Sequence, residues 1–248
     1  MEDDVHHFKV ELRHAREVIT GVEAAAWRTR LMGEAGWPLF ICDLNGERLG
    51  LAAALDDREV GSLIHCAGLS PSMAELDRIL DVNLAATMRL VDTARPRMAE
   101  GAAAVLFSSL AGHMLGTALD EPISKVTTPE AVASLSAYTP DTGAAYSVSK
   151  RGVVLLVRRE ALGFGRRGAR IVSLSPGCID TPMGRAEMET QPIMKVMIDN
   201  SALPRLARPE EVAAVAVFLC STTASFVTGT DFLVDGGVVG GSAPPRRA

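Results

Sequence analysis

Short apolar runs alternate with longer helical patterns along this chain, and this alternation constrains the fold more than any other feature. The runs expected to form strands are Glu17 to Thr20, Pro38 to Cys42, Gly61 to His65, Ala103 to Ser108, Arg170 to Ser175 and Asp231 to Val234. The clearest helical pattern, Glu210 to Cys220, follows Pro209, which suits a first helical turn. Strands that alternate with helices are typical of parallel βαβ units. The sequence therefore predicts an α/β fold built on a parallel sheet.

Length and composition indicate one domain. The chain has 248 residues, of which 48% are hydrophobic, and no Pro/Gly/Ser-rich linker divides it. Neither His65 nor His113 has a second ligand at a useful spacing, so no metal site is expected. We expect reduced thiols and a cytoplasmic protein, because the cysteines are scattered without metal-ligand spacing: Cys42, Cys66, Cys178 and Cys220.

Charge and hydropathy argue against two classes of partner. The start, Met1 to His7, lacks the basic and apolar parts of a signal peptide, and no apolar run reaches membrane-spanning length. No membrane partner is therefore expected. The net charge is −5 without a basic block, which argues against binding to nucleic acid. Residues 241–248 are expected to form a disordered tail.

Tyr146 and Lys150 are the strongest candidates for chemistry. They lie four residues apart in an Ala-rich and Val/Leu-rich stretch that predicts a helix to about Phe164, so they share one helix face. A tyrosine pKa of roughly 10 must fall by about three units to be useful near neutral pH. A cation at ~4 Å, with an effective dielectric of ~20, supplies roughly 4 kcal/mol, which corresponds to about three units. Such a pair can give a proton to an alkoxide or take one from an alcohol.

The chain resembles the short-chain dehydrogenase/reductase family, whose active site is built on Tyr-x-x-x-Lys. Further segments in the expected order carry the resemblance: Cys66-Ala67-Gly68 after a strand, Asp81-Val82-Asn83-Leu84, Val105 to Gly112, Ser175 to Pro182, Phe226-Val227-Thr228-Gly229 and Val234-Asp235-Gly236-Gly237. The resemblance implies a single Rossmann-like oxidoreductase domain over residues 1–248, with a doubly wound parallel sheet in three layers, α/β/α. It also implies a homodimer or homotetramer.

The resemblance implies four catalytic residues. Tyr146 would exchange the proton, and Lys150 would lower its pKa and bind the nicotinamide ribose. Ser109 would orient the substrate oxygen, and Asn83 would hold a relay water through its helix backbone. Simpler roles are the alternatives: Ser109 could end a strand, Asn83 could be a satisfied core amide and Thr181 could cap a helix. The cofactor-binding residues implied are Gly21, Asp43, Ala67, Gly68, Tyr146, Lys150, Pro176, Gly177, Ile179 and Thr181.

The N-terminal part departs from the family pattern. The family's first strand runs into Thr-Gly-x-x-x-Gly-x-Gly, whose glycines let the backbone approach a pyrophosphate. Here Gly21 matches, but Ala25 and Trp27 occupy the next two glycine positions. Either the nucleotide site is degenerate or differently built, or this segment carries an error or a deletion. Asp43 follows the second apolar run, where a carboxylate favours NAD over NADP, although it could also be an N-cap.

An insertion at about 113–142 separates Ser109 from Tyr146, and Thr128-Pro129-Glu130 predicts a short helix within it. We expect the insertion and residues 183–204 to cover the substrate site; an interface role or a passive surface insertion is the alternative. A bacterial subgroup, 3α-hydroxysteroid dehydrogenase/carbonyl reductase, is similar in this insertion. That similarity implies a hydrophobic alcohol or ketone as substrate, steroid-like or aromatic. The alternatives are a 3-oxoacyl thioester reductase and a non-catalytic binding protein that has lost dinucleotide affinity.

Overall fold

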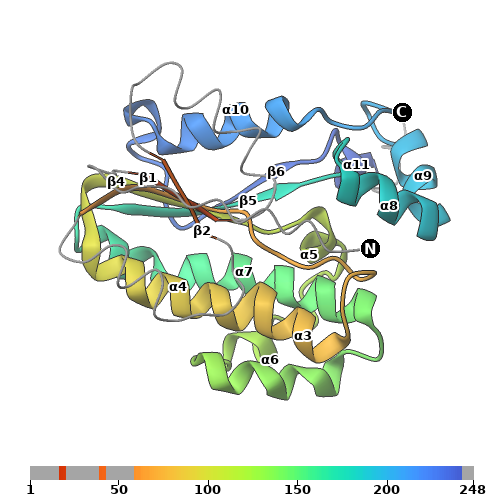
Figure 1. Ribbon diagram of the computed structural model, residues 1–248, viewed down its shortest axis with the longest axis horizontal. Helices are drawn as coiled ribbons and strands as arrows, with labels where there is room; N and C mark the ends of the chain where they lie inside the picture. Colours follow the sequence, from red (N-terminus) through yellow and green to blue (C-terminus); the bar gives the residue numbers. More distant parts are fainter. Residues whose placement is uncertain (1–16, 21–38, 43–58, 242–248) are drawn as a thin grey trace, which may run out of the picture.

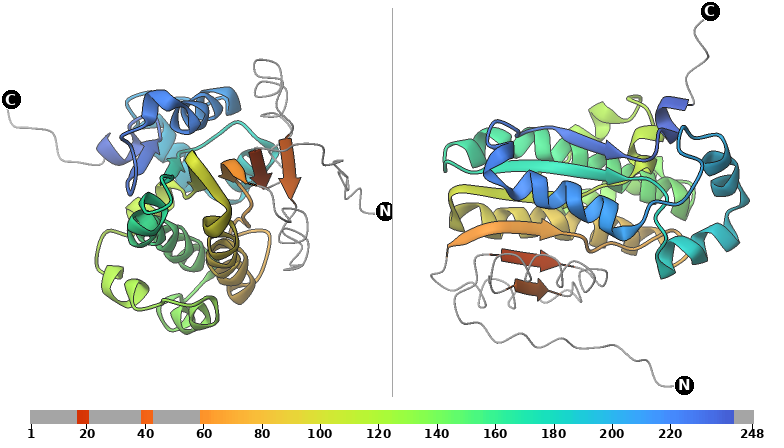
Figure 2. Two further views of the ribbon diagram at one scale, coloured as in Figure 1. Left: turned by 90° about the vertical axis from the view of Figure 1, so that its left-hand side faces the viewer. Right: turned by 90° about the horizontal axis from the view of Figure 1, so that it is seen from above.

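One parallel sheet forms the centre of the molecule. The computed structural model describes residues 17–20, 39–42 and 59–241. Within these ranges the sheet has the order β2-β1-β3-β4-β5-β6, and every neighbouring pair is parallel. The strands are β1 (Glu17–Thr20), β2 (Leu39–Cys42), β3 (Val60–His65), β4 (Met98–Phe107), β5 (Arg170–Pro176) and β6 (Asp231–Val234). The order reverses between β1 and β3, so the sheet is doubly wound as predicted, with β1 and β2 at one edge (Figure 2).

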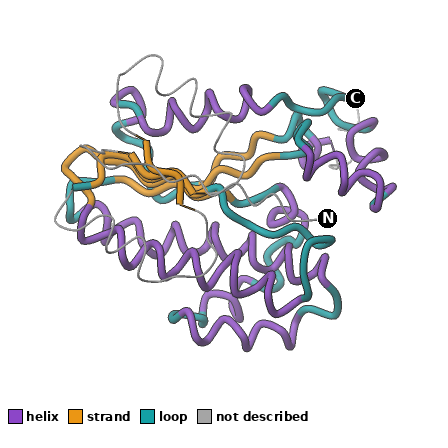
Figure 3. Tube along the Cα trace, viewed as in Figure 1, coloured by secondary structure: helices purple, strands orange, loops and turns teal. Residues whose placement is uncertain are grey.

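Helices cover both faces of this sheet. In Figure 1, α10 lies on one face while α3, α4 and α7 lie on the other, which gives the predicted three layers. Figure 3 shows the helices of the two outer layers with the strands between them. The helical elements are α3 (Leu76–Leu80), η1 (Asp81–Ala85), α4 (Ala86–Ala94), η2 (Arg95–Arg97), α5 (Leu110–Met114), α6 (Asp120–Ser124), η3 (Pro129–Tyr138), α7 (Thr142–Gly165), α8 (Pro182–Thr190), α9 (Pro192–Asp199), α10 (Pro209–Cys220), η4 (Thr222–Ala224) and α11 (Val238–Gly241).

The short apolar runs are strands because both of their faces are covered. All residues of β5 are buried, including the polar Ser173 and Ser175, so both faces of this strand are covered. On the α7 side, Leu63 and Ile171 pack in one cluster with Phe164. On the α10 side, Ile64 and Val172 pack in a second cluster with residues of α10. The predicted fold class and the predicted strands are confirmed.

One strand begins earlier than the sequence predicts. The expected start of β4 was Ala103, but β4 begins at Met98, which pairs with Val60 before a register shift. Gly101 lies between these points with φ +79°, a conformation that glycine adopts without strain. The polar and glycine-containing start of β4 therefore hid the first part of the strand from a search for apolar runs.

The insertion contains two helical segments, α6 and η3. As predicted, a helix begins at Pro129, and the Thr128 side chain accepts a hydrogen bond from Ala131 N at 3.4 Å. The apolar residues Ile123 and Leu135 join the cluster beneath α7. Figure 1 shows α6 on the side of the helical layer that faces away from the sheet. The structure therefore corrects the expectation that the whole insertion covers the substrate site, because α6 and η3 use their apolar side chains to pack on helices.

Arg151 joins the insertion to α7. Its guanidinium donates two hydrogen bonds of 2.6 Å each to the carboxylate of Asp120 in α6. The Arg151 side chain is only 7% exposed, so its charge needs this partner. The predicted tail at 241–248 lies outside the described residues, apart from Gly241 in α11. Among the described residues, no helix is long and apolar enough to cross a membrane, and no cluster of side chains could hold a metal ion.

Candidate active site

Helix α7 carries the Tyr146-Lys150 pair at its N-terminal end. The helix begins there because Asp141 caps it, with the Asp141 carboxylate accepting a hydrogen bond from Ala144 N at 2.7 Å. The Lys150 ammonium lies 5.7 Å from the centre of the Tyr146 ring, which confirms that the two side chains share one helix face. Tyr146 is half-buried, whereas Lys150 is only 5% exposed.

Burial sets the electrostatics of Lys150. Desolvation lowers the pKa of Lys150 to about 8, while the nearby Cys66 thiol acts in the opposite direction. The Lys150 ammonium donates to Phe107 O at 3.1 Å, so it is anchored to the end of β4. Its charge is therefore held in a fixed place beside the phenol of Tyr146.

Two serines follow β4, and the first of them connects this strand to α7. The Ser108 hydroxyl donates to Lys150 O at 2.8 Å and is buried. Ser109 is the N-cap of α5, and its hydroxyl accepts from Ala111 N at 3.2 Å. A Cβ atom at Gly112 would lie 2.9 Å from Arg151 N, so α5 approaches the α7 backbone closely at this glycine. This close approach positions Ser109 next to the helix that carries Tyr146.

Asn83 lies in the π-turn η1 and is 1% exposed. Its side-chain oxygen accepts from Leu69 N at 2.7 Å, and its amide donates to Leu69 O at 3.0 Å and to Ser149 Oγ at 3.2 Å. The simpler alternative, a satisfied core amide, therefore describes the side chain. The amide joins η1, the loop after β3 and α7, and so brings together three elements of the site.

Thr87 and His65 form a hydrogen-bonded pair that supports η1 through the backbone carbonyl of Asn83. Thr87 donates to Asn83 O at 2.8 Å, and the His65 ring nitrogen Nε2 lies 2.8 Å from the same hydroxyl. Burial, and secondarily the charge of Lys150, lower the pKa of His65 to about 3. His65 is therefore neutral near pH 7, and it packs inside the fold beside Thr87.

The loop after β3 (66–75) and the loop after β5 (177–181) lie at the carboxyl ends of their strands, and we call them the first and second walls of the site. A Cβ atom at Gly68 would lie 3.1 Å from Lys150 Nζ and 3.2 Å from Asn83 Oδ1, so this glycine allows both groups to lie beside the chain. A Cβ atom at Gly177 would lie 2.7 Å from Asp235 Cα. The predicted cofactor residues Ala67, Gly68, Pro176, Gly177, Ile179 and Thr181 all lie at the carboxyl ends of β3 and β5, where parallel sheets bind ligands.

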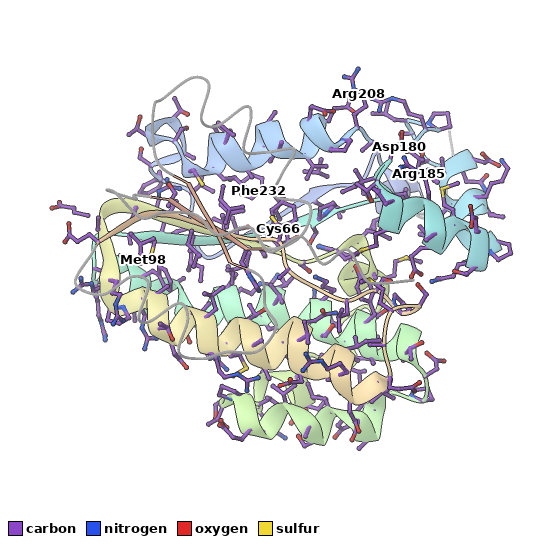
Figure 4. The ribbon with its side chains drawn as sticks, viewed as in Figure 1. Cys66, Met98, Asp180, Arg185, Arg208 and Phe232 are labelled. Carbon is purple, nitrogen blue, oxygen red and sulfur yellow. The ribbon has the colours of Figure 1, made fainter. Side chains whose placement is uncertain are left out.

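Thr181 begins helix α8 at the end of the second wall. Its hydroxyl accepts from Gly184 N at 3.0 Å, so the predicted capping role is confirmed. Asp180 and Arg185 form an ion pair at the start of the same helix, where Figure 4 shows both side chains. Two residues predicted to bind the cofactor, Gly21 and Asp43, lie outside the described residues, as do Ala25 and Trp27.

Several residues that hold the site together carry no signal in the sequence. Ser108, Thr87 and Ser149 act through hydrogen bonds to groups that are distant along the chain or in a neighbouring turn. Serine and threonine are common in strands and helices, so residue type alone does not mark them. Glu187 of α8 was also missed, because a carboxylate on a polar helix is usually solvated.

The arrangement can perform acid–base chemistry on an oxygen atom. A fixed cation beside a half-buried phenol favours the phenolate, and a serine hydroxyl at the neighbouring strand end supplies a second polar group. Gly68 lies beside both the Lys150 ammonium and Asn83 Oδ1, so a cation and an acceptor lie together at the carboxyl end of β3, and this donor and acceptor chemistry suits a nicotinamide ribose.

Comparison with known proteins identifies the family. A family model described as Enoyl-(Acyl carrier protein) reductase matches residues 123–239. The short-chain dehydrogenase/reductase bsc3 of Alternaria brassicicola is 38% identical over 195 residues, which cover 73% of this chain and 70% of that protein. The 3-alpha-hydroxysteroid dehydrogenase/carbonyl reductase of Comamonas testosteroni is 32% identical over 186 residues, 71% of each chain.

A solved structure agrees with these relatives. The 3-alpha-hydroxysteroid dehydrogenase of Pseudomonas sp. B-0831, complexed with NADH, superposes with a TM-score of 0.78 at 27% identity, over 89% of this chain and 95% of that chain. The chain belongs to the short-chain dehydrogenase/reductase family, the NAD(P)-dependent oxidoreductases that act on CH–OH groups.

Proposed function

We propose that this enzyme transfers hydride between a nicotinamide cofactor and a bulky hydrophobic secondary alcohol or ketone. The observation that carries the proposal is the buried Lys150 ammonium, held by Phe107 O on the same face of α7 as the Tyr146 ring. No metal is needed for this chemistry, because the tyrosine and lysine supply the proton transfer.

Each residue has one task. Tyr146 gives a proton to the carbonyl oxygen during reduction and takes it back during oxidation, and Lys150 stabilises the phenolate form. Ser109 orients the substrate oxygen. Asn83 holds the loop after β3 against α7, and thereby fixes Gly68 beside Lys150. When it is bound, the cofactor supplies or accepts the hydride.

We propose NAD as the preferred cofactor, with NADP as the alternative. The Asp43 carboxylate, at the end of the run that forms β2, would accept a hydrogen bond from a ribose 2′-hydroxyl and repel a 2′-phosphate. The NADH complex of the similar 3-alpha-hydroxysteroid dehydrogenase supports this choice. Replacing Asp43 with Ser should shift the preference toward NADPH, measured as the ratio of kcat/KM values for the two cofactors.

The substrate class rests on the relatives and on α8 and α9. Two relatives act, by name, on 3-alpha-hydroxysteroids, and one of them also on carbonyl compounds. The helices that follow the second wall carry methionine and isoleucine side chains that are exposed or partly exposed: Met183, Met188, Ile193, Met194 and Met197. Ile198 of the same segment is buried and packs inside the fold. Methionine adapts to irregular apolar ligands, which suits a steroid-like or aromatic substrate.

A 3-oxoacyl thioester reductase is the second candidate. The matching family model, described as Enoyl-(Acyl carrier protein) reductase, bears on it only through the acyl carrier protein, because an enoyl reductase reduces a C=C bond and not a carbonyl group. An acyl carrier protein is acidic and would need unpaired basic side chains near the entrance. Arg185 is paired with Asp180, and both Arg205 and Arg208 are paired with Glu211. Because these charges are already compensated, we favour a small hydrophobic substrate.

A matched pair of tyrosine variants tests the proposal. The chain has two tyrosines, and Tyr138 in η3 is 47% exposed. Tyr146→Phe should lower kcat at least about a thousandfold for a 3α-hydroxysteroid or an aromatic ketone, because the proton donor is lost, while Tyr138→Phe should stay within twofold. An acetoacetyl thioester serves as the competing substrate. Near-normal turnover by Tyr146→Phe would refute the assignment.

A cofactor titration separates the enzyme from a non-catalytic binding protein. NADH fluorescence is followed during titration of the native chain and of a variant with a Gly-x-x-x-Gly-x-Gly segment of family length at 21–27. Weaker binding by the native chain is expected if Ala25 and Trp27 crowd the pyrophosphate. Binding by neither protein would favour the non-catalytic alternative. A homodimer or homotetramer in the cytoplasm remains our expectation, which sedimentation of the purified protein and cell fractionation test.

A further inference from the structure

Glu187 connects the two walls of the active site. It lies on α8, which follows the loop after β5, yet its carboxylate accepts hydrogen bonds from the backbone N–H of Ser72, at 3.2 Å, and from the Ser72 hydroxyl. Ser72 belongs to the loop after β3, the loop that also contains Gly68 and Leu69. The contact therefore spans the site from one wall to the other.

The environment of Glu187 is unusual for a carboxylate on a surface helix. The residue is only 6% exposed, although its neighbours Ala186 and Glu189 are exposed. Its second oxygen accepts from the side chain of Gln191, and Ser70 contributes a further side-chain hydrogen bond. Burial raises the pKa of Glu187, but the hydrogen bonds outweigh burial and hold the pKa below its ordinary value. Both oxygens have partners, so Glu187 is built to be held rather than to exchange protons.

Helices α8 and α9 make few other hydrogen bonds to the rest of the molecule, although Ile198 of α9 is buried. The chain before them is fixed where Ile179 pairs with Ala207, and the chain after them is fixed where Leu203 N donates to Gly236 O. Between these points, in the part of the chain that the structure describes, the side-chain hydrogen bonds of α8 and α9 to other elements of the fold are those of Glu187 to the Ser70–Ser72 loop. The segment from Asp180 to Ala202, which we call the excursion, is thus anchored at both ends and hydrogen-bonded once in between, through Glu187.

We infer that Glu187 is a positioning residue that fastens α8 across the substrate entrance, and that its release opens the entrance. This inference rests on the proposed function of the site. Because the loop after β3 is itself bound to Asn83 through Leu69, fastening α8 to Ser72 fixes the apolar residues of α8 relative to the catalytic residues. A substrate would then be held by α8 only while the Glu187 contact is intact.

The position of the contact predicts which kinetic constant changes. Glu187 does not belong to the cofactor-binding loops, so its loss should weaken the hold on the carbonyl substrate more than the hold on NADH. Loss of a charge-assisted hydrogen bond changes an equilibrium by roughly tenfold or more. We therefore expect Glu187→Ala to raise KM for the carbonyl substrate about tenfold, with kcat and the Kd for NADH each within about threefold of the native values.

The chain offers graded variants and a matched control. Ser72→Ala removes one donor but keeps the Ser72 N–H, so its rise in KM should be smaller. Glu187→Gln keeps an oxygen acceptor of the same shape and should restore most of the native KM. Glu189→Ala changes an exposed carboxylate on the same helix and should leave KM unchanged.

Limited proteolysis tests the fastening without any need for activity. Trypsin can cut after Lys195 in α9, whose side chain is 71% exposed. Opening of the excursion should accelerate this cut about tenfold in Glu187→Ala and less in Ser72→Ala, while Glu189→Ala should match the native protein. The rate of cutting is measured by mass spectrometry on the folded protein. Thermal unfolding identifies any variant that has lost its fold.

Each outcome decides the inference. Faster cutting with a raised KM supports it. Native cutting rates in both Glu187→Ala and Ser72→Ala would overturn it, and so would faster cutting with an unchanged KM. If Glu187→Ala does not fold, Ser72→Ala and Glu187→Gln give the decision. If the native protein turns over no carbonyl substrate, the proposed function fails, while the cutting rates still decide whether Glu187 fastens α8.

Discussion

Gly112→Ala should separate the two elements that carry the catalytic groups. Gly112 lies in α5, three residues after Ser109, and faces the α7 backbone at Lys150 and Arg151. An added Cβ would lie 2.9 Å from Arg151 N and 3.0 Å from Lys150 C. Ordinary contacts begin near 3.4 Å, so α5 must move by about 0.5 Å. Both neighbours are backbone atoms of a long buried helix and cannot rotate away.

The cost can be estimated for stability and for turnover. Overpacking of this kind costs roughly 1–3 kcal/mol, and for a chain of this size each kcal/mol lowers Tm by about 2–4 °C. A displacement of about 1 Å can reduce turnover about a hundredfold, so half of that distance should reduce kcat roughly tenfold. The expected result is therefore a lower Tm together with a lower kcat, while the Kd for NADH changes little.

Gly165→Ala is the matched control, because Gly165 ends α7 and an added Cβ there meets nothing within 4 Å. Alanine favours a helix over glycine by up to ~1 kcal/mol, so this variant should be as stable as the native protein or slightly more stable. Thermal unfolding and steady-state kinetics are measured on both variants. A Gly112→Ala protein with native Tm and native kcat would show that α5 and α7 are not held as closely as described.

Three further results are expected. The kcat/KM for carbonyl reduction should fall above about pH 8, where Lys150 loses its charge. Cys66→Ser should move this fall to lower pH, because Cys66 raises the pKa of Lys150. A pH profile that Cys66→Ser leaves unchanged would contradict this. The folded state should lose roughly 2–3 kcal/mol between neutral pH and about pH 4.5, because unfolded His65 binds a proton below roughly 6.5 and folded His65 only near 3. His65→Gln should remove this part of the loss in urea unfolding, and an unchanged pH dependence would contradict it. Asp120→Ala should lower the free energy of unfolding by about 3 kcal/mol, because it leaves the buried Arg151 charge without its partner. The control Glu121→Gln, at an exposed position, should lower it by less than about 0.5 kcal/mol. Equal Tm values for the two variants would refute the role given to the Asp120–Arg151 pair.

The sequence predicted the sheet well because parallel strands are buried on both faces. The predicted strand from Arg170 to Ser175 became β5 almost to the residue, although its buried residues include the polar Ser173 and Ser175. The start of β4 was missed, since Glu100 and Gly101 interrupt the apolar pattern while the backbone continues in the strand. A backbone pattern can thus continue where the side-chain pattern stops.

The catalytic pair was predictable for a different reason. The spacing of Tyr146 and Lys150 fixes their relation within one helix, so no tertiary information was needed. The contacts of Asn83, Ser108 and Glu187 depend on which loops meet in space, and a single sequence does not contain that information. The part of the insertion in α6 and η3 was placed wrongly for the same reason, because its apolar side chains fit a helix layer as well as a substrate.

The edge position of β1 and β2 has a consequence for how this protein can evolve. These strands join the rest of the sheet through the pairing of β1 with β3, and the proton-transferring residues all come from later parts of the chain. The segment around Gly21 and Asp43 is the one that we propose to meet the adenosine half of a dinucleotide, so mutations there reach the chemical half, within the described part of the sheet, through this one strand pairing. Selection can alter nucleotide affinity in that segment, lose it or restore it, while the geometry around Tyr146 and Lys150 is inherited unchanged.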